Sequence, residues 1–217
     1  SEFLIDTSEV TVGAYGDCVD DGSCASLATG SSGACQGTNS NRIADRSGHP
    51  IDCVSWDEAL AYCDWAGKRL PTEAEWERAA RCDDGRKYPW GPGLDERRAN
   101  FFGSNDPFDR GVGNILQTTP VGYFDGSIRD GYQTRSGASP FGVHDQVGNV
   151  WEWTADWFSA DHHVNGPRDS PQGPAQGDSR TTRGGSYLCH ESYCNRYRVA
   201  ARSSSTPDSS TGNLGFR

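Results

Sequence analysis

Two cysteines near the end of the chain, Cys189 and Cys194, give the clearest chemical signal in the sequence. They are five residues apart, so a turn or a strand could bring their sulfur atoms together. Their thiolates would then form a redox-active disulfide or bind Cu(I), a soft ion that accepts as few as two sulfur ligands. Three nearby arginines, Arg183, Arg196 and Arg198, would favour the thiolate form. One more structural disulfide is the competing interpretation.

A second group of polar residues lies between positions 145 and 153. The carboxylates of Asp145 and Glu152, with the backbone carbonyls between them, offer the oxygen ligands that calcium prefers. Trp151 and Trp153 alternate with Glu152, and we expect one to face the core and the other a cleft. A tight turn that leads into a buried aromatic strand, without a metal, is the alternative.

The histidines give a weaker signal. His162 and His163 are adjacent in an acidic segment, where we expect exposure to solvent. His190 lies between the two cysteines and could orient their site, although a surface position is the simpler expectation. The sequence has no Ser/His/Asp arrangement, phosphate-binding glycine loop or HExxH motif, so hydrolase and nucleotide-binding functions lack support.

Charge and hydropathy exclude two classes of partner. The chain has 30 acidic and 20 basic residues, a net charge of −10, so binding to nucleic acid is not expected. No apolar run approaches the roughly 18 residues of a membrane span, and no signal-peptide segment is visible, so we expect neither feature. The 27 glycines and 11 prolines favour turns and ordered loops.

Six of the eight cysteines lie in the first 82 residues. Their even total is typical of disulfides in an oxidising compartment, which favours an extracytoplasmic location, with the cytoplasm as the alternative. We expect all six to be structural. They are Cys18, Cys24, Cys35, Cys53, Cys63 and Cys82. Three of them lie in residues 16–50, which we expect to be an ordered loop pinned by disulfides, with a flexible linker as the alternative.

The elements that must position these residues are short. Residues 3–12 are rich in β-branched residues and predict a strand that turns into a short helix or a second strand. Two capping boxes, Ser55 with Glu58 and Thr72 with Glu75, predict two helices. Short strands separated by turns fit the last 35 residues. We therefore predict one α+β domain, residues 1–217, with little regular secondary structure.

Several motifs together resemble the formylglycine-generating enzyme family, also called sulfatase-modifying factors. The superfamily is marked by residues 67–77 (GKRLPTEAEWE), 148–153 (GNVWEW), 183–186 (RGGS) and 215–217 (GFR). The more specific match is the run 185–198 (GSYLCHESYCNRYR), followed by 200–203 (AARS) and 206–210 (TPDSS). The resemblance implies a compact fold related to C-type lectins. It also implies a copper-dependent oxidase that uses O2 to convert a cysteine in an unfolded sulfatase polypeptide, within a Cys-x-Pro-x-Arg motif, to Cα-formylglycine. We expect a monomer.

The resemblance also assigns roles to single residues. It places Cu(I) on Cys189 and Cys194 and puts Ser186 and Trp151 near the copper and oxygen pocket. His190, Ser210 and Asn213 are expected to line the substrate cleft. One structural Ca²⁺ site is expected from side-chain and backbone oxygens of Asp145, Gly148, Val150 and Glu152. A second would begin at Asn100 and Phe101, but residues 105–109 (NDPFD) depart from the family pattern.

Other features leave alternatives open. Val199 stands where animal members have a cysteine, and the early cysteines resemble those of a bacterial branch, in which a Cys18–Cys24 or a Cys63–Cys82 pair is possible. A non-catalytic ligand-binding or display protein on the same fold is the alternative function. An iron-dependent sulfoxide synthase would need a three-histidine site from a further domain, which this sequence lacks.

Overall fold

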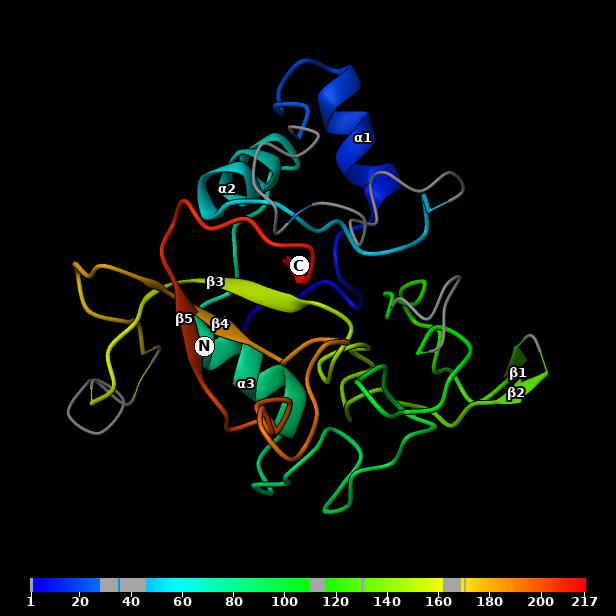
Figure 1. Cartoon of the computed structure of the whole chain (residues 1–217). Coiled ribbons are helices and arrows are strands. Elements are labelled where there is room, and N and C mark those ends of the chain that lie inside the picture. The colour runs from blue at the N-terminus through cyan, green and yellow to red at the C-terminus, as the bar shows by residue number, and fades with distance from the viewer. Residues whose placement is uncertain are drawn as a thin grey trace.

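The centre of the fold is a small curled sheet. The structure is a computed structural model that describes residues 2–27, 35, 46–109, 116–129, 131–161, 169 and 171–217. The sheet contains β3 (Trp151–Trp157), β4 (Arg180–Arg183), β5 (Ser203–Ser205) and β6 (Leu214–Gly215) in the order β5-β4-β3-β6. The β3–β4 and β4–β5 pairs are antiparallel, and the β3–β6 pair is parallel. A separate hairpin of β1 (Ile128–Arg129) and β2 (Tyr132–Gln133) projects from the body (Figure 1).

Helices cover the two faces of this sheet. The helices α1 (Val12–Asp20) and α2 (Trp56–Trp65) lie on one side, and α3 (Glu73–Arg81) lies on the other (Figure 1). Aromatic and aliphatic residues of α1 and α2 form the main core with Trp153, Leu214 and Phe216. Trp76 and Ala80 of α3 form a second, smaller cluster with Val199. No helix among the described residues is long and apolar enough to cross a membrane.

Both predicted capping boxes are present. Ser55 and Glu58 exchange side-chain and backbone hydrogen bonds at the start of α2, and Thr72 and Glu75 do the same at α3. Each box satisfies two backbone N–H groups that the first helical turn leaves free. The two capping boxes therefore predict correctly where two of the three described helices begin.

The strand predicted over residues 3–12 is largely wrong. This segment forms one isolated bridge, between Thr11 and Pro50, and α1 then begins at Val12. The backbone N–H of Val10 donates to the carbonyl of Phe216, and the N–H of Ile51 donates to the carbonyl of Val10. The two partners of Val10 belong to different segments far away in the sequence. Residues 3–12 therefore do not pair with a single neighbouring strand.

Four of the six early cysteines form disulfides, whereas all six were expected to be structural. Cys18 is bonded to Cys24, and Cys35 is bonded to Cys53. Cys63 is buried in α2 and Cys82 ends α3, and both are free thiols. The expected Cys18–Cys24 pair is therefore present, whereas the Cys63–Cys82 pair is wrong.

A buried ion pair lies where the two ends of the domain meet. Nε and Nη2 of Arg217 donate to the Glu152 carboxylate at 2.5 and 2.6 Å, and neither side chain is exposed. The remaining donors of Arg217 reach the backbone carbonyls of Asp6 and His144. Trp76 Nε1 of α3 donates to the same carboxylate at 2.8 Å. One pair thus joins β3, the end of the chain, the segment before α1, and α3.

We predict that Arg217→Met lowers the free energy of unfolding by about 3–5 kcal/mol, because it leaves the buried Glu152 carboxylate without the guanidinium that pairs with it. Urea unfolding at fixed calcium concentration measures the change. The matched control is Arg69→Met, which breaks the exposed ion pair between Arg69 and Glu75 and should cost less than about 1 kcal/mol. Equal losses in the two variants would contradict the prediction.

Candidate active site

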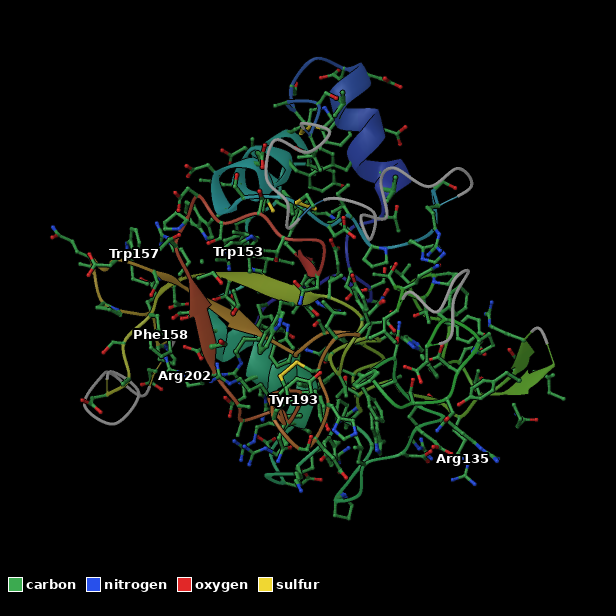
Figure 2. All side chains as sticks on the ribbon, viewed as in Figure 1. Arg135, Trp153, Trp157, Phe158, Tyr193 and Arg202 are labelled. Atoms are coloured by element: carbon green, nitrogen blue, oxygen red, sulfur yellow. A yellow bond between two sulfur atoms is a disulfide. The ribbon has the colours of Figure 1, made fainter. Side chains whose placement is uncertain are left out.

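Two tight turns after β4 bring Cys189 and Cys194 together. The N–H of Cys189 donates to the carbonyl of Ser186, and the N–H of Cys194 donates to the carbonyl of His190, both at 2.9 Å. The two Cα atoms are 5.2 Å apart, and the sulfur atoms are joined in a disulfide (Figure 2, beside Tyr193). The predicted proximity is therefore present. The bonded pair is the oxidised form of a dithiol whose reduced form would offer two adjacent thiolates.

The surroundings of the pair are apolar. Cys189 is buried in a cluster with Tyr88, Phe101 and Tyr197, and Cys194 packs against this cluster from its half-buried position. Trp151 packs against this cluster and also against the main core, which contains Trp153. The expectation that the two tryptophans divide between core and cleft is therefore wrong in its simple form. Both reach the main core, and Trp151 alone also borders the cysteines.

Ser186 is the centre of a hydrogen-bond network beside Cys189. Its buried hydroxyl oxygen accepts from Nδ2 of Asn213 at 2.9 Å and from the N–H of Leu188 at 3.3 Å. The carbonyl of Asn213 accepts from the N–H of Trp151 at 2.8 Å. The fold therefore brings Ser186, Trp151 and Asn213 together beside the cysteine pair, and their roles there stay predictions.

Ser210 lies on the same segment as Asn213. The backbone carbonyl of Ser210 is 3.3 Å from the Cys35 sulfur, which is bonded to Cys53. The N–H of Cys53 in turn donates to the carbonyl of Thr211 at 3.0 Å. A disulfide from the early part of the chain thus supports the segment that carries two of the predicted cleft residues.

An aromatic surface, formed by Phe102, His190 and Tyr193, borders the cysteines on the other side. The His190 ring stacks on Tyr193 with centroids 5.9 Å apart and meets the edge of Phe102 at 5.5 Å. Tyr193 is 68% exposed and Phe102 is 40% exposed, so their rings are available to a partner. A cavity of about 640 Å³ opens beside His190. A larger cavity of about 810 Å³, lined by Phe3 and Trp157, contains none of the predicted site residues.

Sequence reasoning assigned His190 to the cleft but did not single out Phe102 and Tyr193. The signal for Tyr193 was present, because it lies within the motif that contains both cysteines. Phe102 carried no local signal, since only the fold brings residue 102 to the cysteines. His162 and His163 lie outside the described residues.

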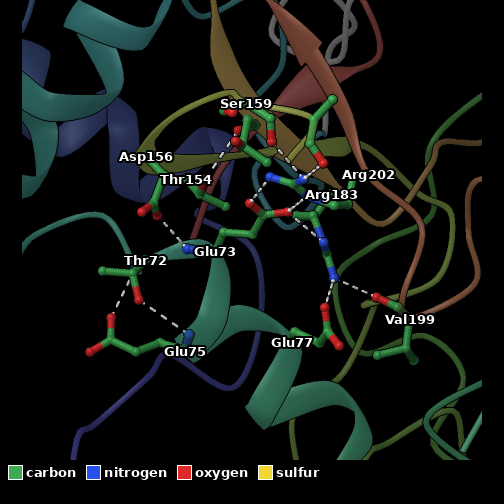
Figure 3. A network of polar contacts seen from close by, with 12 residues as sticks. Thr72, Glu73, Glu75, Glu77, Thr154, Asp156, Ser159, Arg183, Val199 and Arg202 are labelled. Carbon is green, nitrogen blue, oxygen red and sulfur yellow. Dashed lines mark hydrogen bonds and ion pairs between the residues drawn. The ribbon is translucent and has the colours of Figure 1, made fainter. Parts of the chain in front are cut away.

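Arg183 does not assist the cysteines, and that expectation is wrong. Its guanidinium is fully buried and pairs with Glu73 at 2.6 Å and Glu77 at 2.7 Å, both on α3 (Figure 3). It also donates to the carbonyl of Val199, and Arg202 pairs with the same Glu73 carboxylate. The charge of Arg183 is thus neutralised by α3, and its role is to hold β4 where the turn to Ser186 begins.

The expected calcium residues lie in a buried acidic cluster. Asp145 and Glu152 are both buried, and a third buried carboxylate, Glu9, lies beside them. Burial, followed by the neighbouring charges of Asp145 and Glu152, raises the pKa of Glu9 well above its usual value. Burial also raises the pKa of Asp145. Among the described residues, Arg217 is the guanidinium in direct contact, and it pairs with Glu152. The raised pKa values of Glu9 and Asp145 reflect burial and, for Glu9, repulsion that a bound cation would relieve.

Calcium at this cluster would need a combination of side-chain and backbone oxygens. No three His, Cys, Asp or Glu side chains in the described part of the chain converge to hold a metal by themselves. The carboxylate of Asp145 accepts from the N–H of Gly122, while Glu152 accepts from Arg217 and Trp76. Carbonyl oxygens of Gly148 and Val150 would have to complete the site. Glu9 was missed because it is far from these residues in the sequence.

The expected second calcium site has less support. Nδ2 of Asn100 donates to the carbonyl of Gln117, and the carbonyl of Asn100 accepts from the N–H of Asn149. The Phe101 ring packs against Tyr197. Asp106 lies in residues 105–109, which differ from the family pattern. Its carboxylate accepts from the Ser104 hydroxyl and from two backbone N–H groups. These contacts give Asn100 and Phe101 structural roles, and we do not propose calcium there.

Known proteins resemble this chain over most of its length. A family model described as "Sulfatase-modifying factor enzyme 1-like domain" matches residues 1–217. The formylglycine-generating enzyme of Thermomonospora curvata is 50% identical over 183 residues, covering 81% of this chain and 56% of that protein. The mouse formylglycine-generating enzyme is 46% identical over 180 residues, covering 81% and 45%. The chain thus spans about half the length of these curated relatives.

A solved structure confirms the fold. PvdO from Pseudomonas aeruginosa superposes with a TM-score of 0.72 at 24% identity, covering 97% of this chain and 77% of that one. At this identity the likeness concerns the fold alone. The predicted α+β domain with little regular secondary structure is confirmed, and it has the same fold as PvdO.

Proposed function

Because the chain belongs to the sulfatase-modifying factor enzyme 1-like family, we propose that it converts a cysteine in a sulfatase polypeptide to Cα-formylglycine. The observation that carries this proposal is the cysteine pair, with Cys189 and Cys194 held together beside Ser186 and Asn213. Relatives called formylglycine-generating enzymes, 46–50% identical, support the same activity. The substrate is an unfolded segment with a Cys-x-Pro-x-Arg motif, and the chain acts on it as a monomer.

The reduced cysteine pair is suited to Cu(I). Two thiolates at this separation form a soft, low-coordinate donor set, and the apolar neighbours Phe101, Tyr197 and Trp151 limit access of water. When bound there, Cu(I) would supply the redox chemistry with O2 that removes hydrogen from the substrate cysteine. Loss of two hydrogens from its Cβ–Sγ unit gives a thioaldehyde, and the two electrons and two protons reduce O2 to hydrogen peroxide. Water then replaces the sulfur, which leaves as hydrogen sulfide.

The chain's own residues position the substrate. Ser210 and Asn213 lie on the segment beside the cysteines, where an extended polypeptide can contact backbone and side-chain polar groups. On the opposite side, the aromatic surface of Phe102, His190 and Tyr193 offers flat apolar contacts to a proline ring. The Ser186 hydroxyl contacts Asn213, and the Ser186 carbonyl accepts from the N–H of Cys189. This arrangement holds the substrate cysteine against the pair while bulk water is kept away.

One observation favours the alternative function. The pair is bonded in this structure, as a purely structural disulfide would be, and exposed aromatic side chains also suit a non-catalytic binding or display protein. Replacing one cysteine of the pair distinguishes the two functions. The replacement abolishes aldehyde formation if the pair is catalytic, whereas a display protein forms no aldehyde in any variant.

We predict that the reduced protein, loaded with Cu(I) and incubated in air with a Cys-x-Pro-x-Arg peptide, gives an aldehyde product by mass spectrometry. Cys189→Ser and Cys194→Ser should each abolish the product, because each removes one sulfur ligand. Cys82→Ser is the matched control and should keep the activity, since Cys82 is a free thiol at the end of α3. A copper-loaded protein that makes no aldehyde would reject the proposed activity.

We also propose that Asp145 and Glu152, with carbonyl oxygens of Gly148 and Val150, bind one structural Ca²⁺ beside Glu9. The crowding of three buried carboxylates around one guanidinium supports the proposal, because a cation would relieve the repulsion that helps to raise the pKa of Glu9. Calcium at this position would stabilise the start of β3, and Trp151 with it. Its role is structural, because the cluster includes none of the residues beside the cysteine pair.

We predict that calcium chelation lowers the Tm by about 5–10 °C, the shift expected when a ligand present at roughly 100 times its Kd is removed. Asp145→Asn should reduce this loss, because it removes one buried charge but keeps an oxygen for the N–H of Gly122. Asp64→Asn, at an exposed carboxylate of α2, is the control and should leave the loss unchanged. Thermal unfolding by circular dichroism measures all three. A Tm unaffected by chelation would argue against the calcium site.

A further inference from the structure

Thr211 makes a contact that no part of the proposed function has used. Its hydroxyl donates to Oδ1 of Asn213 at 2.9 Å. On its other side, the same amide donates through Nδ2 to the Ser186 hydroxyl oxygen at 2.9 Å. Thr211 therefore contacts the oxygen of the Asn213 amide, and the nitrogen of the same amide contacts Ser186.

The backbone holds Thr211 in place. Its carbonyl accepts from the N–H groups of Cys53 and Leu214 at 3.0 and 3.1 Å. The Tyr187 hydroxyl donates to the carbonyl of the next residue, Gly212, at 2.9 Å. The Cys35–Cys53 disulfide contacts the residue before Thr211 through the Cys35 sulfur, which lies beside the Ser210 carbonyl. With its backbone fixed on three sides, the Thr211 hydroxyl has a defined position from which to select one orientation of the Asn213 amide.

The orientation of this amide decides what the Ser186 hydroxyl can do. A serine oxygen has two acceptor positions and one proton. Both acceptor positions of Ser186 are filled, by Nδ2 of Asn213 and by the N–H of Leu188. The Ser186 proton is therefore free to be donated to a group that enters the site. If the amide turned over, Oδ1 of Asn213 would face Ser186 and accept that proton instead.

We propose that Thr211 is a positioning residue, which fixes the Asn213 amide so that Ser186 remains a hydrogen-bond donor toward the substrate. The proposal rests on the proposed formylglycine-generating activity for its catalytic consequence. The orientation of the amide can be observed without it. Among the hydrogen bonds of the described residues, Thr211 makes none with Cys189, Cys194 or Ser186. It therefore acts on the site through Asn213.

The first test compares three variants with the peptide substrate. Thr211→Val keeps the shape and removes the hydroxyl, and kcat should fall about five- to tenfold, the effect of one neutral hydrogen bond. KM should change by less than about twofold, because Ser210 and the aromatic surface proposed to bind the substrate are unaltered. Thr211→Ser should restore kcat. Thr206→Val removes an exposed hydroxyl from the same segment, which contacts Asp208 and Ser209, and should change nothing.

A double-mutant cycle with Ser186→Ala separates positioning from a general effect on the fold. Without the Ser186 hydroxyl, the orientation of the amide no longer matters, so adding Thr211→Val should lower kcat no further. A further five- to tenfold loss in the Ser186→Ala background, or an unchanged kcat in Thr211→Val alone, would overturn the proposal.

The second test needs no activity. ¹⁵N NMR of the Asn213 side-chain amide, assigned with Asn213→Ala, should show a changed chemical shift in Thr211→Val and an unchanged shift in Thr206→Val. An amide signal that is the same in Thr211→Val and in the unaltered protein overturns the proposal, whether or not the protein makes aldehyde. If the signal changes as expected but the unaltered protein makes no aldehyde, the orientation by Thr211 is supported and the proposed function alone fails.

Discussion

The buried pair of Glu152 and Arg217 is the interaction on which the rest of the structure depends. Neither side chain is exposed, so each charge requires the other as its partner. Glu152 stands opposite Gly215 in the parallel pairing of β3 and β6, and the neighbouring pair is Trp151 with Leu214. This register also fixes the hydrogen bond from Trp151 to Asn213 at the edge of the candidate site. A buried charge pair thus determines where two of the site residues meet.

The α3 helix provides the second constraint. Its carboxylates neutralise Arg183 at the end of β4, immediately before the turn that presents Ser186 and Cys189 (Figure 3). Gly184 and Gly185 make that turn with positive φ angles of 91° and 73°. A side chain at Gly185 would meet the backbone of Tyr197. A long irregular segment can therefore hold a defined geometry, because charged contacts fix its start and close packing fixes its path.

Local signals predicted the parts of the fold that depend on nearby residues. The capping boxes at Ser55 and Thr72 and the approach of Cys189 to Cys194 involve partners within a few positions. The family resemblance added Ser186 and Asn213, and it left Cys18–Cys24 open as one of two possible pairs. Glu9, Phe102, Thr211 and the Cys35–Cys53 disulfide were beyond prediction, since their contacts join segments that only the folded chain brings together. The strand expected at residues 3–12 failed for the same reason.

We propose that Cys189 and Cys194 bind a metal as a pair in their reduced state. X-ray absorption spectroscopy of the reduced protein with one equivalent of Cu(I) identifies the copper ligands. We expect a copper ion with two sulfur neighbours, and loss of one of them in Cys194→Ser but not in Cys82→Ser. Copper bound only by nitrogen or oxygen, or a spectrum that Cys194→Ser leaves unchanged, would contradict it and leave the pair as a structural disulfide.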